Sequence, residues 1–479
     1  MASEVIVPTT ARRLASYTDS FGRDGLSDMT MANARMVLLD TLGCALAALK
    51  DCNSAAVLQA TVEDIGGRPE ATIFGSGLRT NALNALLVNG ALVRYLDCND
   101  GFIVITPTGM TGGHPSDAIP MILALAERQG KSGADTLTTI VLAYQLYGRL
   151  ATCEERPLAS HGWTVEAICP LFTPLIAGKM LGLTVDQLEQ AVGISGTHGF
   201  ALGILDTDGE EYGMTKNIRF GRMAYQGVMA AYQAARGFTG TRRVIEGHFG
   251  WNEVIMNGGL QIDRLKLDGN EVGYLVDEIF IKMFSADGSQ LGHLSATYQL
   301  ISEHDIHPDD IAEVRLKASR RCVTHCAGQE KRDPRTKELA DHSVYYTTAA
   351  LIARRSLGPS EYTAEVLGDP KIRSFMNCVS IEPDVELDSY GAAGISEIIL
   401  RSGPTFKARV DYPRGHPKNP MAYSEVVSKF MALASPVVGE DRASEIETAV
   451  ADLQDAPDIA SLMELMTLSN RRSRASGRC

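Results

Sequence analysis

The sequence predicts a mostly α-helical protein, in which a large all-helical domain is built from both ends of the chain and a smaller α/β domain is inserted between them. Three observations support this prediction. Apolar residues recur at three- and four-residue steps through most of residues 10–270, which is the period of an amphipathic helix. Strand-like runs are concentrated within residues 311–413, and helical periodicity returns after them.

The predicted domain boundaries are 1–272 for the first helical part, 273–413 for the α/β domain and 414–479 for the helical return. A chain of 479 residues is long enough for two or three domains with a large buried core. Its 45% hydrophobic and 22% charged residues are normal for a soluble globular protein.

The net charge limits the classes of binding partner that we expect, and the cysteine content indicates the cellular compartment. A formal net charge of -13 and a pI near 5.3 argue against broad affinity for nucleic acid or anionic membranes, so an anionic ligand would need local cations. Nine cysteines without regular spacing, and no secretory apolar segment near the N-terminus, favour a reducing, cytoplasmic location. The longest apolar run, from Met36, is interrupted by Asp40 and is expected to be a buried helix.

Polar residues gather most densely between Asn89 and Glu127, where a Gly-, Thr- and Pro-rich loop is expected to join two apolar helices at 80–96 and 117–128. They are Asp97, Asn99 and Asp100 before the loop and His114, Ser116 and Asp117 after it. Asp97 ends an apolar helical stripe, so burial is expected to raise its pKa into a range useful for proton transfer. The alternative is a solvated loop, with Asp97 on the surface.

His114 is expected just outside a helix N-terminus that Ser116 or Asp117 can cap. The partial positive charge of such an end favours a neutral imidazole and attracts anions. The alternative is that His114 only assists capping.

Further helices are predicted at 133–151, within 161–199 and from about 209 to 237. The second helix of the 161–199 segment starts after Thr184, with Gln187 at capping-box spacing. The 209–237 helix opens with Lys216, Arg219 and Arg222, whose charges oppose the helix dipole unless an anionic ligand is bound. A solvated basic face is the alternative.

The α/β domain opens with Lys282, Asp287, Ser289 and Gln290 just before a predicted helix. Strands are predicted at 311–319, 379–386, 395–403 and 405–413, and a helix at 337–355. Cys322, His325 and Cys326 lack a second ligand pair for zinc, and no phosphate loop, dinucleotide fingerprint or metalloprotease motif occurs. These absences favour an enzyme that needs no cofactor and no metal.

Over nearly its full length the chain resembles the MmgE/PrpD (2-methylcitrate dehydratase) family. The segments that carry the resemblance are LLDTLGCALAAL, NGALVRYLDCND, GGHPSDAIPMILALAE, GKMLGLTVDQLEQAVGISGTHG, ELADHSVYYTTAALI and YPRGHPKNPM. The resemblance implies that the α/β domain is a lid, that the protein is a homodimer, and that no metal is required. Family members include 2-methylcitrate dehydratases, cis-aconitate decarboxylases and iminodisuccinate epimerases.

The resemblance also assigns residues. The catalytic residues would be Asp97, His114, Lys216 and Lys282, and the substrate-binding residues Asn99, Thr164, Asp287 and Gln290. Arg219 is added to the substrate-binding residues because its charge, close to Lys216 in sequence, can assist in binding a carboxylate. Three positions depart from the family pattern: Gly101 stands where the dehydratases carry threonine, Thr164 where a histidine or aspartate is usual, and Asp287 where the decarboxylases carry histidine. The Ser289-Gln290 pair is more like the dehydratases.

Together these features predict a lyase that dehydrates a small anionic hydroxy-polycarboxylate similar to 2-methylcitrate. Lys216 and Lys282 would clamp its carboxylates, while Asp97 and His114 would share proton transfer, with the base unassigned. Decarboxylation of cis-aconitate and epimerisation need the same carbanion stabilisation and remain alternatives. A catalytically inactive metabolite-binding protein is a further alternative.

Overall fold

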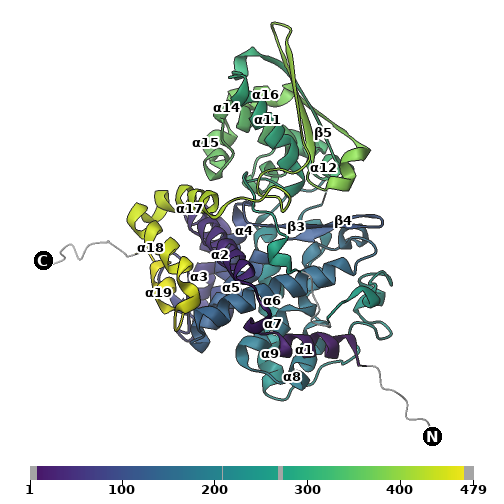
Figure 1. Cartoon of the computed structure of the whole chain (residues 1–479), viewed down its shortest axis with the longest axis vertical. Coiled ribbons are helices and arrows are strands. Elements are labelled where there is room, and N and C mark those ends of the chain that lie inside the picture. The colour runs from purple at the N-terminus through teal and green to yellow at the C-terminus, as the bar shows by residue number, and fades with distance from the viewer. Residues whose placement is uncertain (1–7, 208, 268–272, 469–479) are drawn as a thin grey trace, which may run out of the picture.

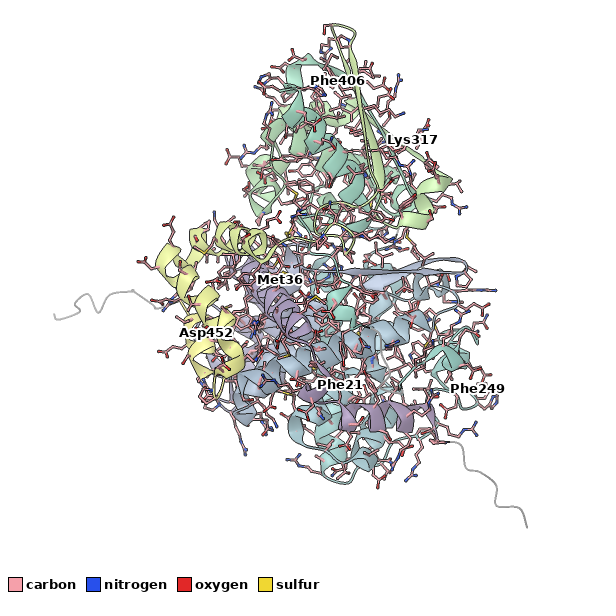
Figure 2. All side chains as sticks on the ribbon, in the orientation of Figure 1. Phe21, Met36, Phe249, Lys317, Phe406 and Asp452 are labelled. Carbon is pink, nitrogen blue, oxygen red and sulfur yellow. The ribbon has the colours of Figure 1, made fainter. Side chains whose placement is uncertain are left out.

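The computed structural model describes residues 8–207, 209–267 and 273–468, and it confirms that the protein is mostly α-helical. Figure 1 shows a larger helical body, which contains the purple N-terminal and yellow C-terminal helices, and a smaller body above it that contains a sheet. The hydrophobic core forms two main clusters accordingly, and Figure 2 labels Met36 in the larger body and Phe406 in the smaller one. The predicted boundary at residue 272 lies outside the described residues.

The larger body consists of helices from both ends of the chain. They are α1 (Thr10–Ser20), α2 (Asp28–Ala48), α3 (Asn53–Ile65), α4 (Ala82–Tyr95), α5 (Ile119–Gln129), α6 (Gly133–Thr152), α7 (Thr173–Leu181), α8 (Val185–Ser195), α9 (Arg219–Ala235), α10 (Trp251–Val254), α17 (Tyr423–Val438), α18 (Glu440–Ala451) and α19 (Ala460–Leu465). Their starts follow ordinary capping chemistry, because Ser27, Asn81 and Ser132 accept hydrogen bonds from backbone N–H groups. The capping box predicted between Thr184 and Gln187 is confirmed.

Helix α2 is the central helix of this body. Its 21 residues are long and apolar enough to cross a membrane by length and composition. In the structure most of it is buried, because it packs against α4, α6 and α17. Its apolar character is therefore explained by its place in the core of the helical body.

The smaller body contains a four-stranded sheet in the order β6-β5-β7-β8. Its strands are β5 (Ile311–Ala318), β6 (Val379–Pro383), β7 (Gly394–Leu400) and β8 (Thr405–Val410), so all four predicted strand runs contain a strand. Strands β5 and β6 are parallel and the other pairs antiparallel. The helices of this body are α11 (Leu291–Glu303), α12 (Arg320–Cys326), α13 (Lys337–Ala340), α14 (Val344–Arg354), α15 (Ala364–Leu367) and α16 (Pro370–Phe375).

The helix predicted within 337–355, behind Asp341 and His342, is confirmed as α14, and the chain leaves the helical path between the short helix α13 and α14. Ser343 accepts a hydrogen bond from the Tyr346 N–H and so starts a new helix. The break leaves Asp341 and His342 outside regular helix, where both side chains contact residues of the larger body.

The loop predicted within Asn89–Glu127 is also wrong, because it is a β-hairpin. Strand β3 (Phe102–Thr106) pairs antiparallel with β4 (Gly109–Gly113). The run FIVIT is rich in β-branched and aromatic residues, which favour an extended chain over a loop. Two short strands, β1 (Ala71–Thr72) and β2 (Arg79–Thr80), form a separate pair.

A buried ion pair joins the C-terminal return to the centre of the larger body. Lys429 Nζ of α17 lies 2.6 Å from Asp40 Oδ1 of α2, and it also donates a hydrogen bond of 2.7 Å to the Cys98 carbonyl. Asp40 is 1% exposed, and burial raises its pKa although the Lys429 charge opposes this. One lysine therefore connects α17, α2 and the end of α4.

We predict that Lys429→Met lowers the free energy of unfolding by about 3–5 kcal/mol, because it leaves Asp40 buried without a counter-charge. Chemical denaturation measures the change. The double variant Lys429→Met/Asp40→Asn is the control, and it should recover part of the loss because it contains no unpaired charge. A single variant as stable as wild type would contradict a structural role for the pair.

Candidate active site

A cavity of about 1150 Å³ is lined by residues of both bodies. The β3–β4 hairpin forms much of one wall. The side chains able to bind or transfer protons that line it include Arg94, His114, Thr164, Asp206, Arg219, Asp287, His325 and His342. Four of the nine residues predicted for the site are thus brought to the cavity: His114, Thr164, Arg219 and Asp287.

His114 directly follows strand β4 and precedes a 3₁₀ turn, η2 (Pro115–Ala118). Its Nδ1 lies 2.6 Å from the Asp100 carbonyl oxygen, which can only accept, so Nδ1 carries the proton. Burial lowers its pKa well below 6.5, and the charges of Arg94 and Lys282 lower it further. His114 is therefore a neutral imidazole, and Nε2 is its basic nitrogen.

The capping predicted for Ser116 and Asp117 is wrong. Neither side chain caps η2 or α5. Instead the amide of Asn99 donates to Ser116 Oγ at 2.9 Å and to Asp117 Oδ1 at 3.0 Å. Asn99 is fully buried and holds the two arms of the hairpin together, and it does not line the cavity.

Arg94, in the last turn of α4, lies at the floor of the cavity and is 3% exposed. Its Nη1 is 3.1 Å from Asp97 Oδ1. Its Nε is 3.9 Å from Asp117, whose pKa burial raises to about 7. Within the described part of the chain, Nε and Nη1 of Arg94 make no hydrogen bond. A buried guanidinium with unused donors is a strong candidate for binding a carboxylate.

Asp97 is buried, with an exposed fraction of 1%, so the alternative of a surface residue is wrong. Three cations surround its carboxylate: Arg94, Lys282 at 2.5 Å and Lys216 at 3.2 Å. Burial alone would raise its pKa, but these charges hold it well below 3.8. The predicted rise in the pKa of Asp97 is therefore wrong, because the sequence pattern did not reveal its cationic neighbours.

Lys216 and Lys282 lie behind the cavity wall. Lys216 is in the 3₁₀ turn η6 (Met214–Ile218), before α9 and not in its first turn as predicted. It reaches Asp341 at 3.2 Å, while Lys282 donates to the carbonyls of Asp97 and Ala286, both at 3.0 Å.

This buried cluster contains more positive than negative charge. Lys337 also pairs with Asp341, at 2.6 Å. Four cations, Arg94, Lys216, Lys282 and Lys337, thus face the two carboxylates of Asp97 and Asp341. The excess places a positive potential behind the cavity floor, which favours an anionic ligand.

The small body contributes Asp287 and Gln290 in different ways. Asp287 precedes the 3₁₀ turn η9 (Gly288–Gln290) and accepts a hydrogen bond from the Ser289 N–H at 3.0 Å. Burial raises its pKa, but the nearby His342, His325 and Arg321 hold it well below 3.8, so Asp287 presents a negative charge to the cavity. Gln290 is fully buried, donates to the Asp341 carbonyl at 2.8 Å and does not line the cavity.

Two residues of the large body complete the polar wall. The hydroxyl of Thr164 is buried and, within the described residues, has no hydrogen-bond partner, so it can bind a ligand. Arg219 pairs with Glu166 at 3.0 Å and with Asp206. Arg219 and Arg94 are thus each ion-paired with acidic side chains, and the Nε of each is buried without a hydrogen bond among the described residues.

Two histidines of the small body, His325 and His342, line the cavity. His342 Nδ1 hydrogen-bonds to Asp341 at 2.5 Å, so its Nε2 remains on the side of Asp287, 3.9 Å away. Burial and the Lys216 charge lower the pKa of His342 to about 4. Asp206, His325 and His342 have side-chain atoms within 4.8 Å of one another, close enough to hold a metal ion, as have Asp97, Asp341 and His342. The second group is already neutralised by Lys216 and Lys282, which disfavours a metal there.

Comparisons with known proteins show the family of the chain. The family profile of the MmgE/PrpD N-terminal domain matches residues 12–262, and that of the MmgE/PrpD C-terminal domain matches residues 284–455. The chain belongs to the MmgE/PrpD family. The resemblance inferred from sequence segments is thereby confirmed.

Similar proteins of this family are lyases. The chain is 24% identical to the cis-aconitate decarboxylase of Aspergillus terreus over 95% of both chains, and 24% identical to the cis-aconitate decarboxylase of Homo sapiens over the same shares. It is 25% identical to a probable 2-methylcitrate dehydratase of Saccharomyces cerevisiae, over 81% of this chain and 78% of the relative. The comparisons therefore support a lyase at the level of the family.

Sequence reasoning missed Arg94, Asp206, His325 and His342 as cavity residues. Arg94 precedes Asp97 by three positions, a helical spacing that puts the two side chains on one face. That spacing could have revealed the pair. No local signal marks the others, because they are brought to the cavity from three separate segments.

We predict that Asp97→Asn lowers the free energy of unfolding by about 3–5 kcal/mol, because the variant removes the carboxylate that neutralises three buried cations. The half-buried His114 is outside that cluster, so His114→Gln should keep nearly the wild-type stability and serves as the control. Chemical denaturation of both variants measures the difference. If Asp97→Asn had the same free energy of unfolding as wild type, the buried charge cluster would not contribute to the stability of the fold.

Proposed function

We propose that the protein is a cofactor-independent lyase that removes water from a hydroxy-polycarboxylate similar to 2-methylcitrate. The observation that carries the proposal is the neutral His114, which lies at the same cavity as the buried guanidinium of Arg94. A C–H bond next to a carboxylate is only weakly acidic. Removal of this proton needs a base, and it needs fixed positive charge near the carboxylate on which negative charge develops.

In this proposal His114 Nε2 takes the proton from carbon. Arg94 binds the adjacent carboxylate and stabilises the negative charge that forms on it, and the excess positive charge behind the floor strengthens this effect. Lys282 and Arg94 keep His114 unprotonated and so available as a base. Asp97 orients the cations and does not itself transfer a proton, because its pKa is held far below neutral.

The leaving hydroxyl group needs a proton from the opposite wall. We assign this role to His325, which lines the cavity close to Asp206. Asp287 on that wall is ionised, so a hydroxyl group is accommodated there more readily than a carboxylate. Closure of the smaller body over the cavity would exclude water during the reaction.

Decarboxylation of cis-aconitate is a second candidate, because relatives that align with 95% of this chain carry that name. It requires a carboxylate where dehydration requires a hydroxyl group. The negative charge of Asp287 opposes this arrangement, so we favour dehydration. Epimerisation needs the same base and cations, and it is distinguished from dehydration and from decarboxylation by its product.

We predict that protonation of the base does not slow the dehydration of 2-methylcitrate between about pH 8 and pH 6.5, because the depressed pKa of His114 keeps it neutral over this range. A fall in rate that is caused by protonation of His114 should appear only at lower pH. His114→Gln should lower kcat about 10²-fold or more. The ultraviolet absorbance of the unsaturated product measures both effects.

The half-exposed Trp163, which lines the same cavity without an acid–base group, provides the control substitution Trp163→Phe for the kcat measurement. If His114→Gln retained wild-type kcat, His114 would not be the base. If wild type turned over no hydroxy- or unsaturated polycarboxylate, the alternative of a metabolite-binding protein would be favoured.

We further predict that wild type releases little carbon dioxide from cis-aconitate and that Asp287→Asn increases this release relative to dehydration. The amide removes the negative charge and still offers an oxygen to the Ser289 N–H. Carbon dioxide and unsaturated acid are measured in the same reaction. Efficient decarboxylation by wild type would overturn the assignment of the Asp287 wall to the hydroxyl group.

A further inference from the structure

The lining of the cavity includes large apolar side chains as well as charged groups. Three of its lining residues are large hydrophobic side chains with high exposure: Ile105 at 52%, Ile204 at 59% and Val385 at 67%. A single exposed hydrophobic residue is ordinary on a protein surface. These three come from β3, from the 3₁₀ turn η5 (Gly203–Leu205) and from the 3₁₀ turn η14 (Val385–Tyr390), yet they line one cavity.

The hairpin gives this apolar wall a regular structure. Ile105 is paired with Met110 across the strands, and Ile103 with Gly112. Ile103 and Ile105 are two residues apart, so they share one face of β3, and both line the cavity. Val104 points to the opposite face and packs against the core of the larger body. Ile103 packs partly against the core of the smaller body, whereas Ile105 leaves much of its side chain exposed for contact with a ligand.

The same segments carry the apolar wall and the charged groups of the site. Strand β4 runs directly into His114. Ile204 lies two residues before Asp206, and hydrogen bonds from Gly203 N–H to the Gly162 carbonyl (2.8 Å) and from Thr164 N–H to the Ala201 carbonyl (3.0 Å) fix this segment. The apolar wall is therefore held at a set position relative to the polar groups.

The size of the cavity agrees with a ligand larger than a small polycarboxylate. Pockets for drug-sized ligands measure roughly 300–1,000 Å³. The volume here is about 1150 Å³. The charged groups around Arg94 and His114 account for one end of a ligand, and the rest of the lining includes the three hydrophobic side chains together with Glu210, Arg320, Arg321 and Asp388.

We propose that the substrate carries an apolar chain of several carbons in addition to its carboxylates. This inference rests on the proposed function, which places the hydroxy-polycarboxylate head at Arg94 and His114. The chain extends along Ile105, Ile204 and Val385 and removes their apolar surface from water. A ligand is favoured over a second protein copy because the three apolar side chains line the same cavity as Arg94 and His114.

The direct test is binding of a series of citrates with alkyl chains from methyl to hexyl, measured by calorimetry on the full chain. Each added methylene should lower Kd about threefold, the effect of burying one such group against a partly open wall. A Kd that stays constant or rises along the series would overturn the inference.

Substitutions in the apolar wall test whether it causes the dependence of Kd on chain length. Ile105→Ser and Ile204→Ser should each reduce the ratio of hexyl to methyl affinity severalfold. Val57→Ser on α3 is the control, because Val57 is 58% exposed and does not line the cavity, so the ratio should not change. If Ile105→Ser and Ile204→Ser changed the sedimentation mass of the protein but not the affinity ratio, the wall would be a contact between copies and the inference would be wrong.

Turnover of the same series separates this inference from the proposed function. A rise in affinity with chain length, without formation of an unsaturated product, would support the apolar site and remove the dehydratase proposal. Dehydration with no dependence of Kd on chain length would support the proposed function and overturn the apolar site.

Discussion

The contact of Asp97 with Arg94, Lys216 and Lys282 is the interaction on which the site depends. The three cations come from α4, from the turn before α9 and from the start of the smaller body, so one carboxylate joins three segments far apart in sequence. The backbone at Asp97 has a φ of 51°, a left-handed conformation that costs free energy in a residue other than glycine. The hydrogen bond from Lys282 to the Asp97 carbonyl helps to hold it there.

This cluster also sets the electrostatics of the cavity. It stabilises the fold only partly, because the desolvation of so many charges opposes their mutual attraction. Its excess of positive charge lowers the proton affinity of His114 and attracts an anion to the cavity floor. The same buried charges connect the two bodies and give the cavity a local positive charge in a protein whose net charge is -13.

The β3–β4 hairpin contributes to both kinds of surface in the cavity. Its first strand offers an apolar face, and its second strand ends at His114. The amide of Asn99 donates hydrogen bonds to Ser116 and Asp117 and so links the two chain segments at the base of the hairpin, next to His114. A substituted substrate could therefore be held by its apolar part while its head is positioned at the base.

The sequence by itself determined the helical class, the four strands of the sheet, the capping box at Thr184 and the family, because periodicity, caps and ordered motifs are local properties. It also identified His114, Thr164, Arg219 and Asp287 as site residues, and the structure brings all four to the cavity. Only the tertiary structure decided the charge state of Asp97, which depends on cations 119 and 185 positions away. It likewise placed His325 and His342 at the cavity and Lys216 and Lys282 behind it. The physical reason is that a pKa and an exposed fraction are set by neighbours in space, which the order of residues along the chain does not record.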